Sequence, residues 1–153
     1  MSMRKPSLLL TMLISLALSS VAFAQSNYEL GAVLTPAQIS TLGNMTSFTV
    51  GNATFRILPS SSASGGNVIN DQGKIGRCEG DVLISGIATD QAKRALAPYQ
   101  ASIASTKVYD SLKMVSAKFL NLADAATARN ALANALPDAR VTLPVVFSLP
   151  QSR

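Results

Sequence analysis

The chain has 153 residues, a net charge of +5, one cysteine and no histidine. Without histidine, a Ser-His-Asp or Cys-His catalytic site and a histidine-ligated zinc are excluded, and one cysteine makes neither a thiolate cage nor an intramolecular disulfide. The positive residues are scattered and only 5% of all residues are aromatic, so the basic stripe and stacking platforms that nucleic-acid binding needs are not seen.

Residues 1–24 are typical of an export signal. Arg4 and Lys5 precede an apolar run over residues 8–18, and Ala-Phe-Ala at 22–24 matches a small-x-small cleavage pattern. The apolar run is shorter than the ~20 residues that a membrane span requires. We therefore expect an exported protein, periplasmic or secreted, that begins at Gln25 and makes no membrane contact after signal cleavage.

Residues 25–58 predict a small β-rich extension. Thr35 followed by Pro36 indicates an N-cap and a first helical position, which opens a brief helix. Two β-rich runs, Ser47 to Val50 and Thr54 to Leu58, flank Gly51-Asn52, a pair that favours a hairpin turn. The role of this segment stays open between a wider docking surface and a solubility or stability extension.

Residues 59–80 begin with a Ser/Gly-rich stretch that offers little to bury, and the whole range is predicted to be a loop or linker. Its glycines lack the spacing of a phosphate-binding loop. Cys78 is interpreted as a buried thiol that packs like a small hydrophobe, with intermolecular pairing as the alternative.

Residues 81–147 predict a second, larger domain. A β-branched apolar run from Asp81 to Ile87 indicates a buried strand. Thr89 is expected to cap the following helix, and Pro98 to limit it. Two strands, 106–111 and 113–120, then follow around a short turn.

The last elements complete a repeating pattern. Asn121 with Asp124 resembles a capping box, and a helix continues to the turn at Pro137. Val141 to Phe147 is expected to form one final strand. The order βαββαβ predicts an α+β fold, a ferredoxin-like antiparallel sheet with two helices on one face, preceded by the β-rich extension.

No set of residues in this chain assembles a catalytic or metal site. The eight acidic residues are isolated in sequence, without the spacing of a calcium loop or an obvious carboxylate pair. We therefore expect no catalytic residues, no metal and no cofactor, and a protein that is not an enzyme.

Three motifs in the second half resemble a known family. They are Val108-Tyr109-Asp110, the strand Ser116-Ala117-Lys118-Phe119, and the Ala/Leu-rich helix closed by Leu136-Pro137. Together they are similar to the propeptide-like inhibitors of subtilisin-type serine proteases, including separately encoded external chaperones that act in trans. The resemblance implies a ferredoxin-like domain whose open sheet face packs on the protease while the C-terminal tail lies in the substrate cleft.

The resemblance also implies which residues make contact. The protease-binding tail would be residues 148–153 together with the residue before them: Phe147, Ser148, Leu149, Pro150, Gln151, Ser152 and Arg153. Arg153 would occupy the primary specificity pocket, which implies a trypsin-like or kexin-like protease. The sheet-face docking residues would be Tyr109, Asp110, Met114 and Ser116, although Tyr109 facing the core and Asp110 as a plain turn residue are open alternatives.

The resemblance leads to a functional hypothesis. It implies an exported inhibitor that also acts as a folding chaperone, because binding only the folded protease stabilises it. The alternative is a non-enzymatic interaction module of the cell envelope that shares the fold, since a fold does not determine a function.

Overall fold

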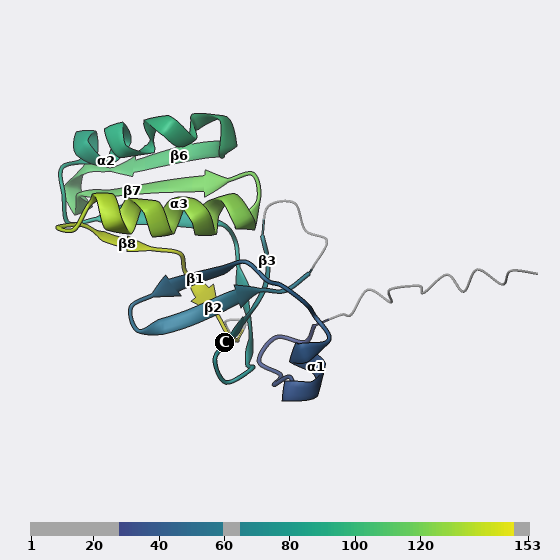
Figure 1. Cartoon of the computed structure of the whole chain (residues 1–153). Helices are drawn as coiled ribbons and strands as arrows, with labels where there is room; N and C mark the ends of the chain where they lie inside the picture. Colours follow the sequence, from purple (N-terminus) through teal and green to yellow (C-terminus); the bar gives the residue numbers. More distant parts are fainter. Residues whose placement is uncertain (1–27, 60–64, 149–153) are drawn as a thin grey trace, which may run out of the picture.

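The computed structural model describes residues 28–59 and 65–148, and these ranges form an α+β fold with antiparallel sheets and three α-helices (Figure 1). One sheet has five strands in the order β1-β2-β3-β4-β9, and the other has four in the order β6-β7-β5-β8. No helix among these residues is long and apolar enough to cross a membrane. The predicted signal segment lies outside the described ranges.

The short helix near the beginning is confirmed. Helix α1 covers Pro36–Ser40, and the Thr35 side chain accepts a hydrogen bond from the backbone N–H of Gln38, while the Gln38 side chain accepts one from the backbone N–H of Thr35. This reciprocal capping satisfies two backbone donors that the helix would otherwise leave free. Gly43 follows with φ of 71°, a conformation that ends the segment.

The predicted hairpin is also confirmed. Strands β1, Ser47–Val50, and β2, Ala53–Ile57, pair in an antiparallel register around the Gly51-Asn52 turn. Gly51 has φ of 60°, which a glycine adopts without steric cost.

The linker predicted over residues 59–80 is wrong for most of its length. Strands β3, Gly66–Asn70, and β4, Ile75–Cys78, form a second hairpin that extends the first sheet. Val68, Ile69 and Ile75 are almost completely buried. Apolar side chains on these strands therefore contribute to the core, although the neighbouring Ser and Gly residues suggested a loop.

The four-stranded sheet begins with β5, Asp81–Ser85, followed by helix α2, Thr89–Leu96. The expectation that Thr89 caps α2 is wrong, because Ala88 occupies the N-cap and makes no side-chain hydrogen bond there. The hydroxyl of Thr89 instead donates to the carboxylate of Asp110, at 2.7 Å. Pro98 lies in the 3-10 turn Ala97–Ser102, which ends the α-helix as predicted.

Strands β6, Ile103–Tyr109, and β7, Met114–Phe119, follow at nearly the predicted positions. Val115, Ala117 and Phe119 are completely buried, as their alternation along β7 indicated. The next helix is α3, Leu122–Ala135, and its capping is confirmed because the Asn121 side chain accepts a hydrogen bond from the backbone N–H of Asp124 at 2.8 Å.

The final strand differs from the prediction. Residues expected to form one strand to Phe147 form two, β8, Arg140–Thr142, and β9, Val145–Val146. Strand β8 pairs with β5, whereas β9 pairs with β4 in the other sheet. Between them, Leu143 is buried and Pro144 cannot donate to a sheet, so the ladder is interrupted there.

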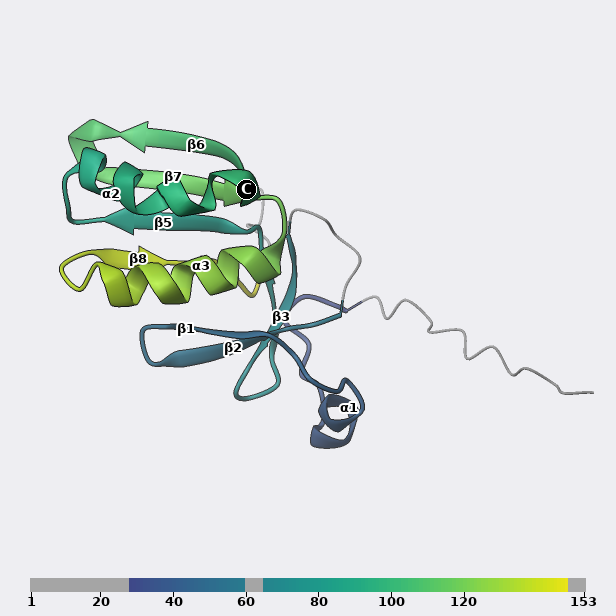
Figure 2. The same ribbon diagram turned by 45° about the horizontal axis from the view of Figure 1, so that its top comes forward.

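One hydrophobic core joins the two sheets. Helices α2 and α3 lie over the same face of the four-stranded sheet, and α3 also lies against β1 (Figure 2). The Asn130 side chain on α3 donates to the carbonyl of Ser47 on β1, at 3.3 Å. Phe48 and Phe55 of the first hairpin belong to the same buried cluster as Leu132 of α3. The β-rich segment predicted as an extension is therefore packed on the rest of the fold.

A second, smaller cluster anchors the beginning of the described chain. Leu58, Ile69 and Ile75 are buried on the five-stranded sheet, and Ile39 of α1 packs against them with Leu42. Residues 31–34 run beside β4, with backbone hydrogen bonds from Gly31 and Leu34 and one isolated bridge. The five-stranded sheet thus has the α3 side of the core on one face and α1 on the other.

Candidate protein-docking face

The four-stranded sheet has one buried and one accessible face, because side chains alternate along each strand. On the helix side, Val82, Ile84 and Val115 are fully buried. The opposite side is here called the open face, and none of its side chains is buried. Its members on strands β5 to β8 are Asp81, Leu83, Ser85, Ser105, Lys107, Tyr109, Met114, Ser116, Lys118, Arg140 and Thr142.

Strand register sets the rows of the open face. Directly opposed residues in an antiparallel pair point to the same side. Tyr109 lies opposite Met114, and Met114 lies opposite Ser85. In the next row, Ser116 lies between Lys107 and Leu83. Three of the four residues predicted from the resemblance are thereby brought together.

The open face has an adaptable rather than a strongly apolar surface. Tyr109 is 40% exposed, whereas Met114 and Ser116 are half-buried. An amphipathic tyrosine and a flexible methionine are side chains that often contribute to protein contacts. Neither residue is enclosed in the core, so the alternative that Tyr109 faces inward does not hold.

Asp110 is separated from the other three predicted residues. It lies in the 3-10 turn Asp110–Leu112 between β6 and β7, and its carboxylate accepts the hydrogen bond from Thr89 at the start of α2. Lys113, which follows this turn, has a backbone φ of 46°, in the left-handed region. Asp110 therefore holds the turn against helix α2.

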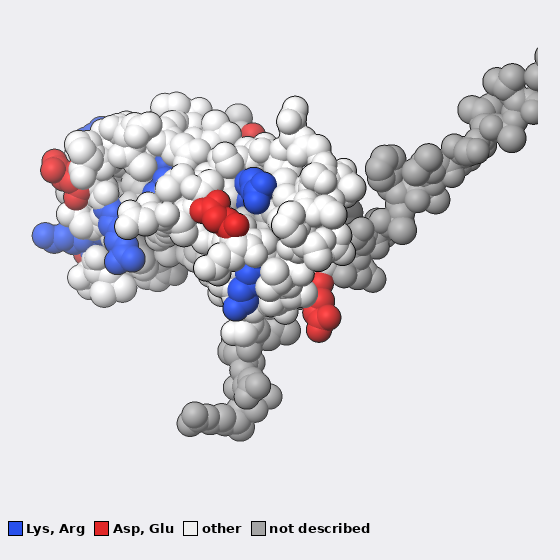
Figure 3. Space-filling view, turned by 60° about the horizontal axis from the view of Figure 1, so that its bottom comes forward, with Lys and Arg blue, Asp and Glu red and all other residues white. Residues whose placement is uncertain are grey.

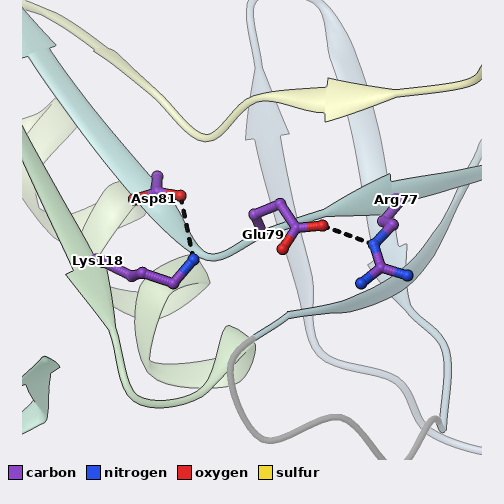
Figure 4. Close-up of polar contacts among 4 residues, drawn as sticks. All are labelled: Arg77, Glu79, Asp81 and Lys118. Atoms are coloured by element: carbon purple, nitrogen blue, oxygen red, sulfur yellow. Dashed lines mark hydrogen bonds and ion pairs between the residues drawn. The ribbon is translucent and has the colours of Figure 1, made fainter. Parts of the chain in front are cut away.

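The charges of this region are few and of both signs. On the open face, Lys118 Nζ lies 3.6 Å from Asp81 Oδ2, and near the connection between the sheets Arg77 pairs with Glu79 at 2.6 Å (Figure 4). Both pairs are solvent-accessible, so each contributes little to stability. On the surface seen in Figure 3, charged side chains occur in small mixed groups with uncharged surface between them. The surface seen in Figure 3 has no continuous basic stripe.

The predicted tail residues have different positions. Phe147 is half-buried, with its ring centroid 6.2 Å from that of Phe55, and is packed against the core. Ser148 is exposed and is the last residue that the structure describes. Leu149, Pro150, Gln151, Ser152 and Arg153 lie outside the described residues. Of the predicted tail residues, Phe147 is therefore held against the fold.

Cys78 has the properties of a structural thiol. It is completely buried, and burial raises its pKa from 9.0 to about 11. At neutral pH the thiol is protonated and therefore a poor nucleophile or metal ligand. Within the described part of the chain, no three His, Cys, Asp or Glu residues are grouped so that they could hold a metal ion.

Sequence reasoning missed several members of the open face. Leu83, Lys107, Arg140 and Thr142 share this surface with the predicted docking residues. Successive side chains of a strand point to opposite faces, so Leu83 lies on the face opposite Val82 and Ile84, but a continuous apolar run does not indicate that one of these faces is accessible.

Comparison with family models, curated proteins and solved structures found no match to this chain.

Proposed function

We propose that this chain is an exported, non-enzymatic inhibitor and folding chaperone of a subtilisin-like serine protease. The open face docks on the protease, and the residues after Ser148 enter the substrate cleft. The observation that carries the proposal is the grouping of Tyr109, Met114 and Ser116 on one accessible sheet face. Their strands belong to the segment that resembles propeptide-like inhibitors.

The order of elements supports a ferredoxin-like plan for residues 81–142. Its elements follow one another as β5-α2-β6-β7-α3-β8, and its strands lie in the order β6-β7-β5-β8. Each helix thus connects two strands that flank a third, as in a split βαβ unit. Both helices cover one face, which leaves the other available for a partner.

The chemistry of the tail determines how inhibition would work. An extended segment bound in a protease cleft obtains affinity from backbone hydrogen bonds and selectivity from side-chain pockets. In the proposed complex, Arg153 occupies the primary specificity pocket. An acidic pocket would pair with its guanidinium, which favours a trypsin-like or kexin-like partner.

Chaperone action follows from selective binding to the folded protease. A ligand at 100 times its Kd stabilises the state it binds by about 2.7 kcal/mol. The proposed complex would thereby favour the native arrangement of the protease. Export provides access to a secreted partner, and N-terminal sequencing of the exported chain is expected to begin at Gln25.

Tail removal tests the proposal. Residues 25–153 are compared with a chain ending at Ser148 against a panel of subtilisin-like proteases, with Ki and thermal unfolding measured for each. We expect the Ki of the shortened chain to be at least ~100-fold higher than that of residues 25–153. The unfolding temperatures of the two inhibitor chains should be the same. Equal inhibition by the two chains would contradict insertion of the tail.

A face variant tests docking separately. Met114→Arg introduces a charge on the open face and is expected to weaken binding both with and without the tail. Gln91→Arg is the matched control, because Gln91 is exposed on helix α2, away from the open face. If both variants bind as the unchanged chain does, the open face is not the docking surface.

A second candidate function is an exported interaction module of the cell envelope. The five-stranded sheet favours it, because β1 to β4 and β9 exceed what a βαββαβ domain contains. Apolar side chains are accessible here, because Val146 of β9 is 47% exposed and Val33, which forms an isolated bridge with Lys74, is 63% exposed. A module of this kind would keep its full affinity after deletion of Leu149 to Arg153, whereas an inhibitor would lose its inhibition and most of its affinity.

A further inference from the structure

The chain leaves the four-stranded sheet before its last described residues. After β8, the buried Leu143 and then Pro144 carry the backbone across to the five-stranded sheet. There Val145 and Val146 of β9 pair with Cys78 and Arg77 of β4. The C-terminal segment is therefore attached to the sheet formed by the beginning of the chain.

Phe147 occupies a socket made by several separate segments. Its ring lies 6.2 Å from the Phe55 ring, and Lys74 Nζ lies 5.4 Å from its centroid. A Cβ on Gly76 would lie 3.0 Å from a ring atom of Phe147 and 2.6 Å from Val145 Cγ1. A Cβ on Gly31 would lie 3.0 Å from the Phe147 carbonyl oxygen.

Two glycines thus provide the space for this contact. Gly76 lies inside strand β4, where a glycine has no side chain to pack and weakens the strand. A glycine in such a position often marks a close approach by another segment. Here the approaching segment is β9 with Phe147, so the strand accommodates the C-terminal segment at this point.

We propose that Phe147 is a positioning residue for the protease-binding tail, and that the five-stranded sheet orients this tail by holding Phe147. The inference rests on the proposed inhibitory function. The anchor fixes the residue before Ser148, because the Phe147 carbonyl lies against Gly31 and its ring lies under Lys74 Nζ. Leu149 to Arg153 can reach at most about 18 Å from Ser148, because an extended chain spans ~3.3–3.6 Å per residue.

Loss of the anchor would lengthen the free segment. Without it, only the two-residue strand β9 would hold the segment to β4, and detachment of β9 would leave β8, which ends at Thr142, as the last paired strand. A longer flexible connection lowers the effective concentration of the tail at the cleft and raises the entropy lost on binding. Inhibition would therefore weaken even though every tail residue and the open face were unchanged.

A cycle of variants separates positioning from general stability. Phe147→Ala is made in the full chain and in a chain ending at Ser148, and Kd for the protease is measured for both. We expect at least a ~10-fold loss in the full chain and no loss in the shortened one. Phe147→Leu, which keeps an apolar group in the socket, is expected to restore most of the affinity.

Gly76→Ala provides an independent route to the same result. The added methyl obstructs the socket while Phe147 and the tail sequence remain intact. We expect this variant to weaken full-chain binding as Phe147→Ala does. An equal loss in the full and shortened chains would overturn the positioning role, because it would show a general structural effect.

Hydrogen exchange of the free protein shows whether Phe147 holds the C-terminal segment against the five-stranded sheet. We expect Phe147→Ala to increase exchange in residues 143–148 and to leave β5 to β7 protected. If the unchanged chain inhibits and Phe147→Ala inhibits equally well, positioning is overturned and the inhibitory function stands. If the unchanged chain inhibits no subtilisin-like protease, the proposed function is overturned together with the inference, whatever the exchange pattern.

Discussion

Phe48→Ala tests whether the two sheets fold as one unit. Phe48 on β1 is only 1% exposed, and its ring is stacked on Phe55 with centroids 5.4 Å apart. The same buried cluster contains Leu132 of α3 and Val82 of β5. Removal of the ring therefore leaves a cavity in a core that both sheets share.

The expected cost follows from burial. Replacement of a buried phenylalanine by alanine costs about 3–5 kcal/mol, including the cavity that remains. The total stability of a domain is only ~5–15 kcal/mol, so this is a large part of it. For a chain of this size we expect a decrease in Tm of ~10–20 °C.

Chemical denaturation gives the loss of free energy, and hydrogen exchange by mass spectrometry shows which strands lose protection. We expect peptides from β5 to β8 to lose protection together with peptides from β1 to β4. Val33→Ala is the control, because Val33 is 63% exposed and its change should remain within ~0.5 kcal/mol. Unchanged protection of β5 to β8 in Phe48→Ala would refute the shared core.

Three further changes test local features. Asn121→Ala removes the side-chain acceptor for the N–H of Asp124 and should cost ~1 kcal/mol in chemical denaturation; no loss would mean that this cap contributes nothing. Gly73→Ala should cost more than ~1–2 kcal/mol in the same assay, because Gly73 has φ of 75° and a Cβ would lie 2.6 Å from the carbonyl oxygen of Leu34. For Cys78, burial raises the pKa from 9.0 to about 11, so only the unfolded chain ionises between these values; stability should be fully present below pH 9 and fall by up to ~1.4 kcal/mol per pH unit as pH rises towards 11. Cys78→Ala should lack this part of the pH dependence, and an unchanged slope would contradict the assignment.

The elements that depend on local signals could be predicted well. Alternation along β7 places Val115, Ala117 and Phe119 on one buried face, and it is visible within six residues. The cap at Asn121 and the turn at Gly51 likewise require only near neighbours in sequence. Such features are determined over a few residues, so a single sequence contains enough information for them.

The hairpin of β3 and β4 was missed because its signals are mixed. Gly66 and Gly76 lie within the strands, and the preceding Ser/Gly stretch suggested a continuous linker. The signal for a hairpin was the pair Val68 and Ile69 before the turn and Ile75 after it, with Gly73 in the turn itself. The reason for Gly76 is the approach of Phe147, a contact between positions far apart in sequence.

The division of the last strand could not be predicted for a related reason. Thr142 pairs with Leu83, whereas Val146 pairs with Arg77 in the other sheet. The apolar run from Val141 to Phe147 contains no mark of this change except Pro144. Among the four predicted docking residues, strand alternation could group Tyr109 with Met114 and Ser116. The hydrogen bond between Asp110 and Thr89 depends on tertiary structure and could not be predicted in this way.

Binding to a subtilisin-like protease with a free and with a covalently blocked active site tests the central claim most directly. A chain of residues 25–153 is titrated against the same protease before and after a peptide inhibitor occupies the cleft, and Kd is measured for both. The proposed mechanism predicts tight binding to the free enzyme and at least ~10-fold weaker binding to the blocked one, with the remainder due to the open face. Equal affinity for the two forms would contradict tail insertion, and absence of binding to any subtilisin-like protease would contradict the proposed function.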